Sequence, residues 1–139
     1  GKLIAWANSN WTHLAISKGV PARLTPADTD KYVLSEKMEM DYAPRKIKLP
    51  DDMTSQESFI VQKHHLDTNH HVNNCQYICM AEDFLPEKFK VYQMRAEYKM
   101  QAKLGDMICP KAKVESGKVV VSLDDEKGKP YAIVELAEK

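Results

Sequence analysis

The stretch that decides the fold of this chain is NNCQYICMAEDFLP, residues 73–86. An Asn at its start can cap a helix, and Pro86 can end it. Between them, apolar residues cover nearly the whole circumference of a helix and leave only three polar positions. A helix of this kind is typical of a protein interior. The sequence therefore predicts a helix buried on all sides, with Cys75 and Cys79 in the core.

Strand patterns flank this helix on both sides. Residues 59–61 precede it as a buried-type strand, and residues 92–102 follow it with strict alternation of apolar and polar side chains. Such alternation predicts a strand with one packed face and one polar face. Three more strand patterns follow, separated by turns at Gly117 and Gly128, and they span residues 108–114, 119–123 and 131–136.

The predicted order is one strand, an apolar helix and four antiparallel strands. The helix is buried most economically when the sheet of these strands wraps around it. The predicted fold is therefore α+β, the hot-dog fold, in which an antiparallel sheet surrounds a buried central helix. Before it, residues 3–8 and 11–16 are strand-forming runs and predict a β-hairpin. Thr25 followed by Pro26 predicts the start of a short helix.

Composition excludes several classes of protein. The 139 residues hold 20 Lys and Arg against 20 Asp and Glu, and this balance argues against nucleic acid as a partner. No run approaches the ~18 apolar residues of a membrane span, and no leader is evident, so we expect a cytoplasmic protein without a membrane span. Cys75, Cys79 and Cys109 form no even set and no C-x-x-C pair, which fits a reducing compartment.

Titratable side chains concentrate at residues 64–71, HHLDTNHH, between the first strand and the helix. This cluster has three possible interpretations: a metal site, a polar loop and a catalytic loop. A metal site has enough ligands, but doubled histidines point in different directions and no i, i+4 pair is present, so we expect no metal. The cluster can also be a polar loop, in which we expect His64, His65 and His70 to be solvated or loop-packed. The third reading is a catalytic loop at a helix N-terminus.

Residues 67–78, DTNHHVNNCQYI, resemble the D-x-N-x-H-V-N-N-x-x-Y-I signature of acyl-acyl carrier protein thioesterases. Residues 3–5 with Trp11, residues 42–47, and residues 97–99 with Gly105-Asp106 resemble the same family. The resemblance implies a double hot-dog protein and three regions of chain. Residues 1–43 would hold the last strands of a truncated first hot-dog domain, 44–54 a linker, and 55–139 the second hot-dog domain.

The resemblance also implies an activity, the hydrolysis of the thioester that joins a fatty acyl chain to acyl carrier protein. The free fatty acid is released, chain elongation ends, and no cofactor is needed. The implied catalytic set is Asp67, Asn69 and His71, and the implied partner is acyl carrier protein with its phosphopantetheine arm. We expect backbone N–H groups of Val72, Asn73 and Asn74 to face the oxyanion.

The chain departs from the family pattern at two neighbouring positions. Gln101 stands where a catalytic Glu is common, and Ala102 stands where some members carry Cys. An amide can orient a water molecule but cannot accept its proton. The strand alternation also places Gln101 on the polar face, so it reaches the site only if a bulge re-aims it or if that face lines the groove.

Two other functions stay open. An acyl-coenzyme A thioesterase shares the pantetheine arm of the substrate, and a non-hydrolytic acyl-binding or structural remnant would explain Gln101. The chain is expected either to form a homodimer or to pair with a missing N-terminal hot-dog domain, because a lone hot-dog sheet leaves an open edge.

Overall fold

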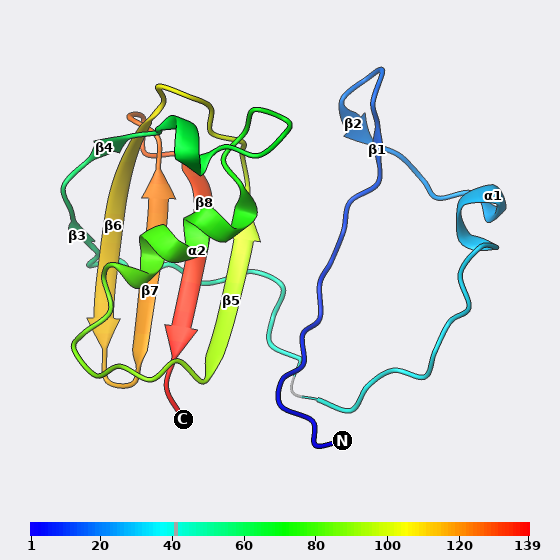
Figure 1. Cartoon of the computed structure of the whole chain (residues 1–139), viewed down its shortest axis with the longest axis horizontal. Helices are drawn as coiled ribbons and strands as arrows, with labels where there is room; N and C mark the ends of the chain where they lie inside the picture. Colours follow the sequence, from blue (N-terminus) through cyan, green and yellow to red (C-terminus); the bar gives the residue numbers. More distant parts are fainter. Residues whose placement is uncertain (41) are drawn as a thin grey trace. The chain divides into compact units, whose positions relative to one another are not determined.

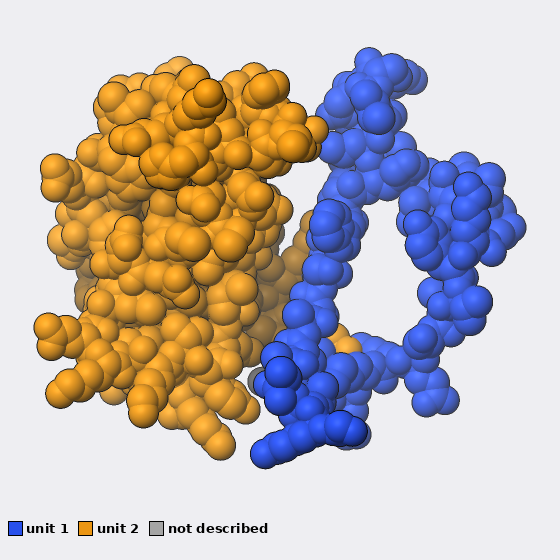
Figure 2. All heavy atoms as spheres, viewed as in Figure 1, with its two compact units in different colours: residues 1–41 blue, residues 42–139 orange. Residues whose placement is uncertain are grey.

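A computed structural model describes residues 1–40 and 42–139 of the chain. It divides into two compact units, residues 1–41 and residues 42–139, coloured separately in Figure 2. In Figure 2 the atoms of the second unit form a filled body, whereas those of the first unit follow the course of the chain. In the described part of the chain, no helix combines the length and apolar character needed to cross a membrane.

The first unit contains a short hairpin of β1 (Leu14–Ala15) and β2 (Val20–Pro21). The predicted strand at residues 11–16 contains β1, whereas residues 3–8 form no strand and β1 pairs instead with β2, which follows it. The chain turns at Gly19, whose φ is +63° and whose N–H donates to the Ala15 carbonyl at 2.8 Å. Glycine adopts this left-handed conformation without steric cost, so the hairpin forms around Gly19 rather than between residues 8 and 11.

The first unit also contains the predicted short helix, α1 (Pro26–Thr29). Its start is confirmed by the contacts of Thr25, whose main-chain N–H and hydroxyl both donate to the Asp28 carboxylate, at 2.9 and 2.7 Å. This arrangement satisfies a donor at the helix start that has no intrahelical partner.

The second unit is an antiparallel sheet with a helix across one face (Figure 1). The strand order is β3-β6-β7-β8-β5, and β4 also pairs with β6. The strands are β3 (Thr54–Ser55), β4 (Phe59–Ile60), β5 (Gln93–Tyr98), β6 (Met107–Glu115), β7 (Lys118–Asp124) and β8 (Pro130–Ala137). The four antiparallel strands that the sequence predicts after the helix are β5 to β8, and they are confirmed.

The helix is α2 (Asn74–Glu82), which follows the short 3-10 helix η1 (Lys63–His65). It places Tyr77, Met80 and Ala81 against the core strands, so the hot-dog arrangement of a sheet around a helix is confirmed. The prediction of a helix buried on all sides is wrong. Cys75 and Cys79 are exposed rather than in the core, because the sheet covers only one face of α2.

The opposite face of the sheet is also covered. Ile47 is buried there against Val120 and Ile133, with Leu49 and Met53 beside it. This is the cyan segment that passes behind the sheet in Figure 1. Residues 44–54, expected as a linker, therefore lie within the second unit and contact the sheet.

Strand β5 lies at the edge of the sheet, and it ends earlier than its alternating pattern predicts. Tyr92, Met94 and Tyr98 are exposed, although their pattern places them on the packed face. Ala96 packs against the core, as predicted, and Ala102 is fully buried beyond the end of the strand. An edge strand has a neighbour on one side only, which explains the exposure of its larger side chains.

Candidate active site

The candidate site is built on the tight loop 67–71, which the backbone closes at its base. Leu66 and Val72 form an antiparallel bridge, and the Asp67 N–H donates to the His71 carbonyl at 2.8 Å. At the tip, His70 takes a φ of +61°, and its N–H donates to the Asp67 carbonyl at 3.1 Å. These bonds fix the backbone positions from which the candidate side chains project.

The Asp67 carboxylate lies inside this loop. Its Oδ1 accepts the Asn69 N–H at 2.8 Å and the His71 N–H at 3.3 Å. The pKa of Asp67 is lowered, mainly by the Asn69 N–H, with further contributions from the His71 N–H and from the His71 side chain. The structure therefore brings Asp67, Asn69 and His71 together, with the carboxylate held in its ionised form.

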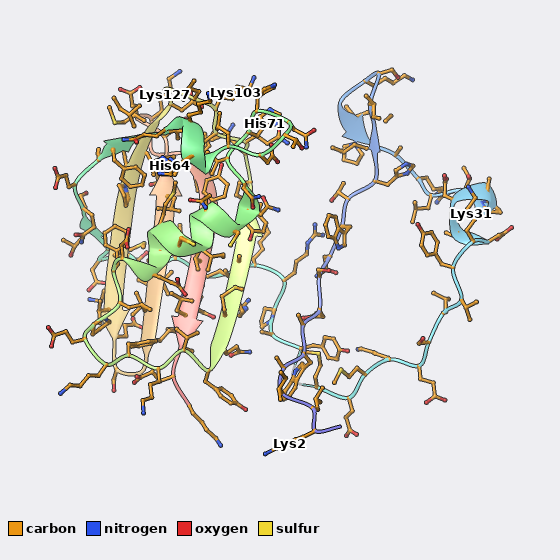
Figure 3. The ribbon with its side chains drawn as sticks, viewed as in Figure 1. Lys2, Lys31, His64, His71, Lys103 and Lys127 are labelled. Atoms are coloured by element: carbon orange, nitrogen blue, oxygen red, sulfur yellow. The ribbon has the colours of Figure 1, made fainter. Side chains whose placement is uncertain are left out.

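The segment that contains Gln101 runs beside this loop. His71 forms an antiparallel bridge with Lys103, and the Val72 N–H donates to the Ala102 carbonyl at 2.9 Å. Figure 3 places His71 and Lys103 at the same end of the second unit. Gln101 is exposed and directly precedes Ala102 in the chain.

A bulge precedes Gln101. The N–H groups of Lys99 and Met100 both donate to the Tyr131 carbonyl, at 2.8 and 3.2 Å. Two residues of one segment thus oppose one residue of β8, which is the definition of a β-bulge. The alternation that assigns Gln101 to the polar face stops before it reaches Gln101.

The start of α2 offers fewer free N–H groups than its sequence predicts. The Val72 N–H is bonded to Ala102, and the Asn73 N–H donates to the His65 carbonyl at 2.9 Å. The Asn73 side chain caps the helix, because its Oδ1 accepts the Cys75 N–H at 2.9 Å. The Asn74 N–H, at the first helical position, is then the one of the three without an acceptor among residues 1–40 and 42–139.

The remaining histidines of the cluster have separate surroundings. His65 Nδ1 accepts the Gln62 N–H at 3.0 Å, and burial lowers the His65 pKa. Its ring meets that of His64 edge to face, with centroids 4.1 Å apart, while His64 and His70 are exposed. Within the described residues, no three His, Cys, Asp or Glu side chains gather in a way that could hold a metal ion.

Sequence reasoning did not identify one side-chain contact beside the candidate site. Tyr77 is 2% exposed, and its hydroxyl accepts the Ala102 N–H at 3.0 Å. A tyrosine at a buried helix position usually finds a polar partner for its hydroxyl, so the residue type was the available signal.

A surface hollow of about 260 Å³ lies between the turns at Gly105–Met107 and Asp125–Lys127, with Tyr131 in its wall. Asp67, Asn69, His71 and Gln101 do not line this hollow. Its volume is near the lower limit for a ligand pocket, and its lining is largely charged. The candidate site is therefore defined by the 67–71 loop and the start of α2 rather than by this hollow.

Residues 48–135 match the family model for the acyl-ACP thioesterase C-terminal domain. No curated protein matches the chain. The fold is similar to that of an acyl-ACP thioesterase from Bacteroides thetaiotaomicron, with a TM-score of 0.76 and 16% identity over 89% of this chain and 52% of that one.

Two further solved structures are similar. A 12:0-ACP thioesterase from Umbellularia californica has a TM-score of 0.68 and 16% identity, over 89% of this chain and 51% of that one. A Staphylococcus aureus protein solved in complex with CoA has a TM-score of 0.53 and 15% identity, over 61% and 73%. The chain spans about half the length of the two acyl-ACP thioesterases.

Proposed function

This chain belongs to the acyl-ACP thioesterase C-terminal domain family, and we propose that the intact protein hydrolyses fatty acyl thioesters of acyl carrier protein. The observation that carries the proposal is the gathering of Asp67, Asn69 and His71 in one loop at the start of α2. The reaction adds water across the thioester bond and yields a free fatty acid and the pantetheine thiol.

The residue types suit this reaction. A thioester is already activated, so the enzyme needs a positioned water molecule and donors for the oxyanion that develops. We assign the holding and polarising of the carbonyl or the water to Asn69 and His71. Asp67 orients both, since its carboxylate accepts the N–H groups of these two residues.

The proposed oxyanion donor is the Asn74 N–H. Val72 and Asn73 were also expected as donors, but their N–H groups are bonded to Ala102 and His65. An N–H at the first position of a helix is directed outward and carries the positive end of the helix dipole. This combination favours a developing negative charge on the thioester oxygen.

Two substitutions at Asp67 test the proposal. Asp67→Asn keeps an oxygen that can accept the two loop N–H groups but removes the charge, so we expect a folded protein with no turnover. Asp67→Ala removes both and should also destabilise the loop. Hydrolysis of lauroyl-ACP and lauroyl-CoA should be measured side by side, with circular dichroism as the check of folding. An unchanged rate in Asp67→Asn would overturn the assignment.

The two substrates decide between the candidate functions. Faster cleavage of lauroyl-ACP supports the proposal, whereas equal or faster cleavage of lauroyl-CoA favours the coenzyme A alternative. If neither is cleaved, binding of lauroyl-ACP without turnover would favour a non-hydrolytic role. The observation that motivates this last alternative is Gln101, whose amide cannot take a proton from water.

Gln101→Glu tests that point directly. Gln101 is exposed and adjoins the Ala102 carbonyl that binds Val72, so a carboxylate placed there lies next to the proposed site. General-base catalysis typically contributes ~10²–10⁴-fold. We therefore expect Gln101→Glu to raise kcat, and an unchanged kcat would count against a missing base at this position.

We also propose that residues 1–43 belong to a separate hot-dog domain. The supporting observation is the exposure of Trp6 and Trp11, at 51% and 88%. Large apolar side chains gathered in one segment are usually covered by another surface. The chain expressed alone should therefore self-associate in analytical ultracentrifugation, and a stable monomer would contradict this assignment.

A further inference from the structure

We propose that Tyr77 is a positioning residue of the site, and that its hydroxyl fixes residues 101–103 against the 67–71 loop. The effect on turnover rests on the proposed function, whereas the tether itself does not. Tyr77 belongs to α2, and the residue that it binds, Ala102, lies 25 positions further along the chain.

The Tyr77 hydroxyl supplies a hydrogen-bond acceptor for the buried N–H of Ala102. Ala102 is fully buried, but it lies after the end of β5 at Tyr98 and before the start of β6 at Met107. Its N–H therefore has no partner in the sheet ladder, and a buried N–H without an acceptor is strongly disfavoured. The Tyr77 hydroxyl accepts that N–H at 3.0 Å.

The same residue is bonded on its other side. The Ala102 carbonyl accepts the Val72 N–H at 2.9 Å, and the next residue, Lys103, forms a bridge with His71. One line of hydrogen bonds thus runs from α2 through Ala102 to the end of the 67–71 loop. A shift of Ala102 would move Gln101 on one side and His71 on the other.

The Tyr77 ring is held independently of its hydroxyl. It is buried in the core cluster and lies 6.1 Å, centroid to centroid, from the Tyr98 ring. Burial raises the Tyr77 pKa, so the hydroxyl stays neutral. Tyr77→Phe keeps the ring contacts and removes only the tether, which makes this substitution a direct test.

The first measurement is amide hydrogen exchange in the intact protein, read at Ala102 and Val72. We expect Tyr77→Phe to speed amide exchange at both residues by roughly five- to ten-fold. This factor corresponds to the free energy that one ordinary hydrogen bond contributes. Tyr92→Phe is the matched control, because Tyr92 is exposed at the start of the β5 segment. Unchanged exchange at Ala102 in Tyr77→Phe would overturn the tether.

The second measurement is the kinetics of lauroyl-ACP hydrolysis. We expect Tyr77→Phe to lower kcat by roughly ten- to a hundred-fold with little change in KM, because small misplacements of catalytic groups are costly. Ile108→Val, which trims a fully buried side chain in β6, should lower Tm comparably and leave kcat unchanged.

The outcomes separate the two claims. If Tyr77→Phe lost no more kcat than Ile108→Val, its role would be structural and the positioning assignment would be refuted. If the wild-type protein cleaved neither thioester, the proposed function would fail, and the exchange data alone would decide whether Tyr77 tethers Ala102.

Discussion

Replacing Asn73 with Ala tests how the start of α2 is held. The Asn73 side chain accepts the Cys75 N–H at 2.9 Å, and its main-chain N–H donates to the His65 carbonyl. Alanine removes the first bond and keeps the second. Loss of such a cap costs about 1 kcal/mol. In a unit of the size of residues 42–139, this lowers Tm by roughly 4–8 °C.

Urea denaturation followed by circular dichroism measures this loss, and calorimetry gives the Tm. The midpoint should fall at constant m-value, because the substitution changes stability and not the surface exposed on unfolding. Asn73→Ser and Asn73→Asp are the matched controls, since both side chains supply a cap acceptor. Their free energies of unfolding should stay within about 0.3 kcal/mol of the wild-type value. Lauroyl-ACP hydrolysis should fall in Asn73→Ala, because the Asn74 N–H lies in the same turn.

Two results would refute this reasoning. The first is a Tm of Asn73→Ala within about 1 °C of the wild-type value, and the second is a loss of stability in the Ser and Asp variants as large as in the Ala variant. A third result would change the role assigned to Asn73 and leave the description of the fold as it is. Loss of turnover in all three variants without loss of stability would indicate that the Asn73 amide contacts the substrate.

Two further predictions concern stability. Ile47→Ala should destabilise the second unit by about 2–3 kcal/mol, because Ile47 is buried against Val120 and Ile133. The control Leu104→Ala, at an exposed position, should change stability by less than about 0.5 kcal/mol. Equal urea midpoints for the two variants would mean that residues 44–54 are not packed against the sheet. Because the folded pKa of Asp67 lies below its ordinary value of 3.8, the stability contributed by its charge is present above that value and is lost as pH falls through the lowered pKa. The difference in urea midpoint between wild type and Asp67→Asn should therefore be constant from pH 7 to pH 5 and shrink below pH 4, and a change centred near neutral pH would contradict the assignment.

Sequence patterns predicted most of the sheet because its strands obey simple periodicity. Val119, Val121 and Leu123 alternate toward the core, and β8 pairs with them in register. The exposure of Cys75 and Cys79 was not predictable in this way. An apolar helix pattern shows that a residue can be buried, but which face is covered depends on the neighbouring layer, and in the second unit the sheet covers one face of α2.

The candidate site was predictable in its residue types but not in its hydrogen bonds. The 67–74 motif indicates a loop followed by a capped helix, and Asn73 is the cap. The partners of the Val72 and Asn73 N–H groups are the carbonyls of Ala102 and His65, and they meet only after the chain has folded. The bulge at Lys99–Met100 likewise depends on the hydrogen bonds of both residues to the Tyr131 carbonyl, and the local sequence pattern does not predict it.

The surroundings of Asp67 bear on its role in the proposed reaction. A carboxylate whose pKa is lowered by two N–H groups is a weak base at neutral pH, so Asp67 is poorly suited to take a proton from water. Its negative charge acts instead on the adjacent His71 side chain, whose charge in turn contributes to the lowered pKa of Asp67. A carboxylate with a lowered pKa stays ionised at neutral pH, so it can keep holding the main-chain N–H groups of Asn69 and His71. The proposed reaction therefore needs a proton acceptor other than Asp67, and Gln101→Glu tests whether a carboxylate at position 101 can supply one.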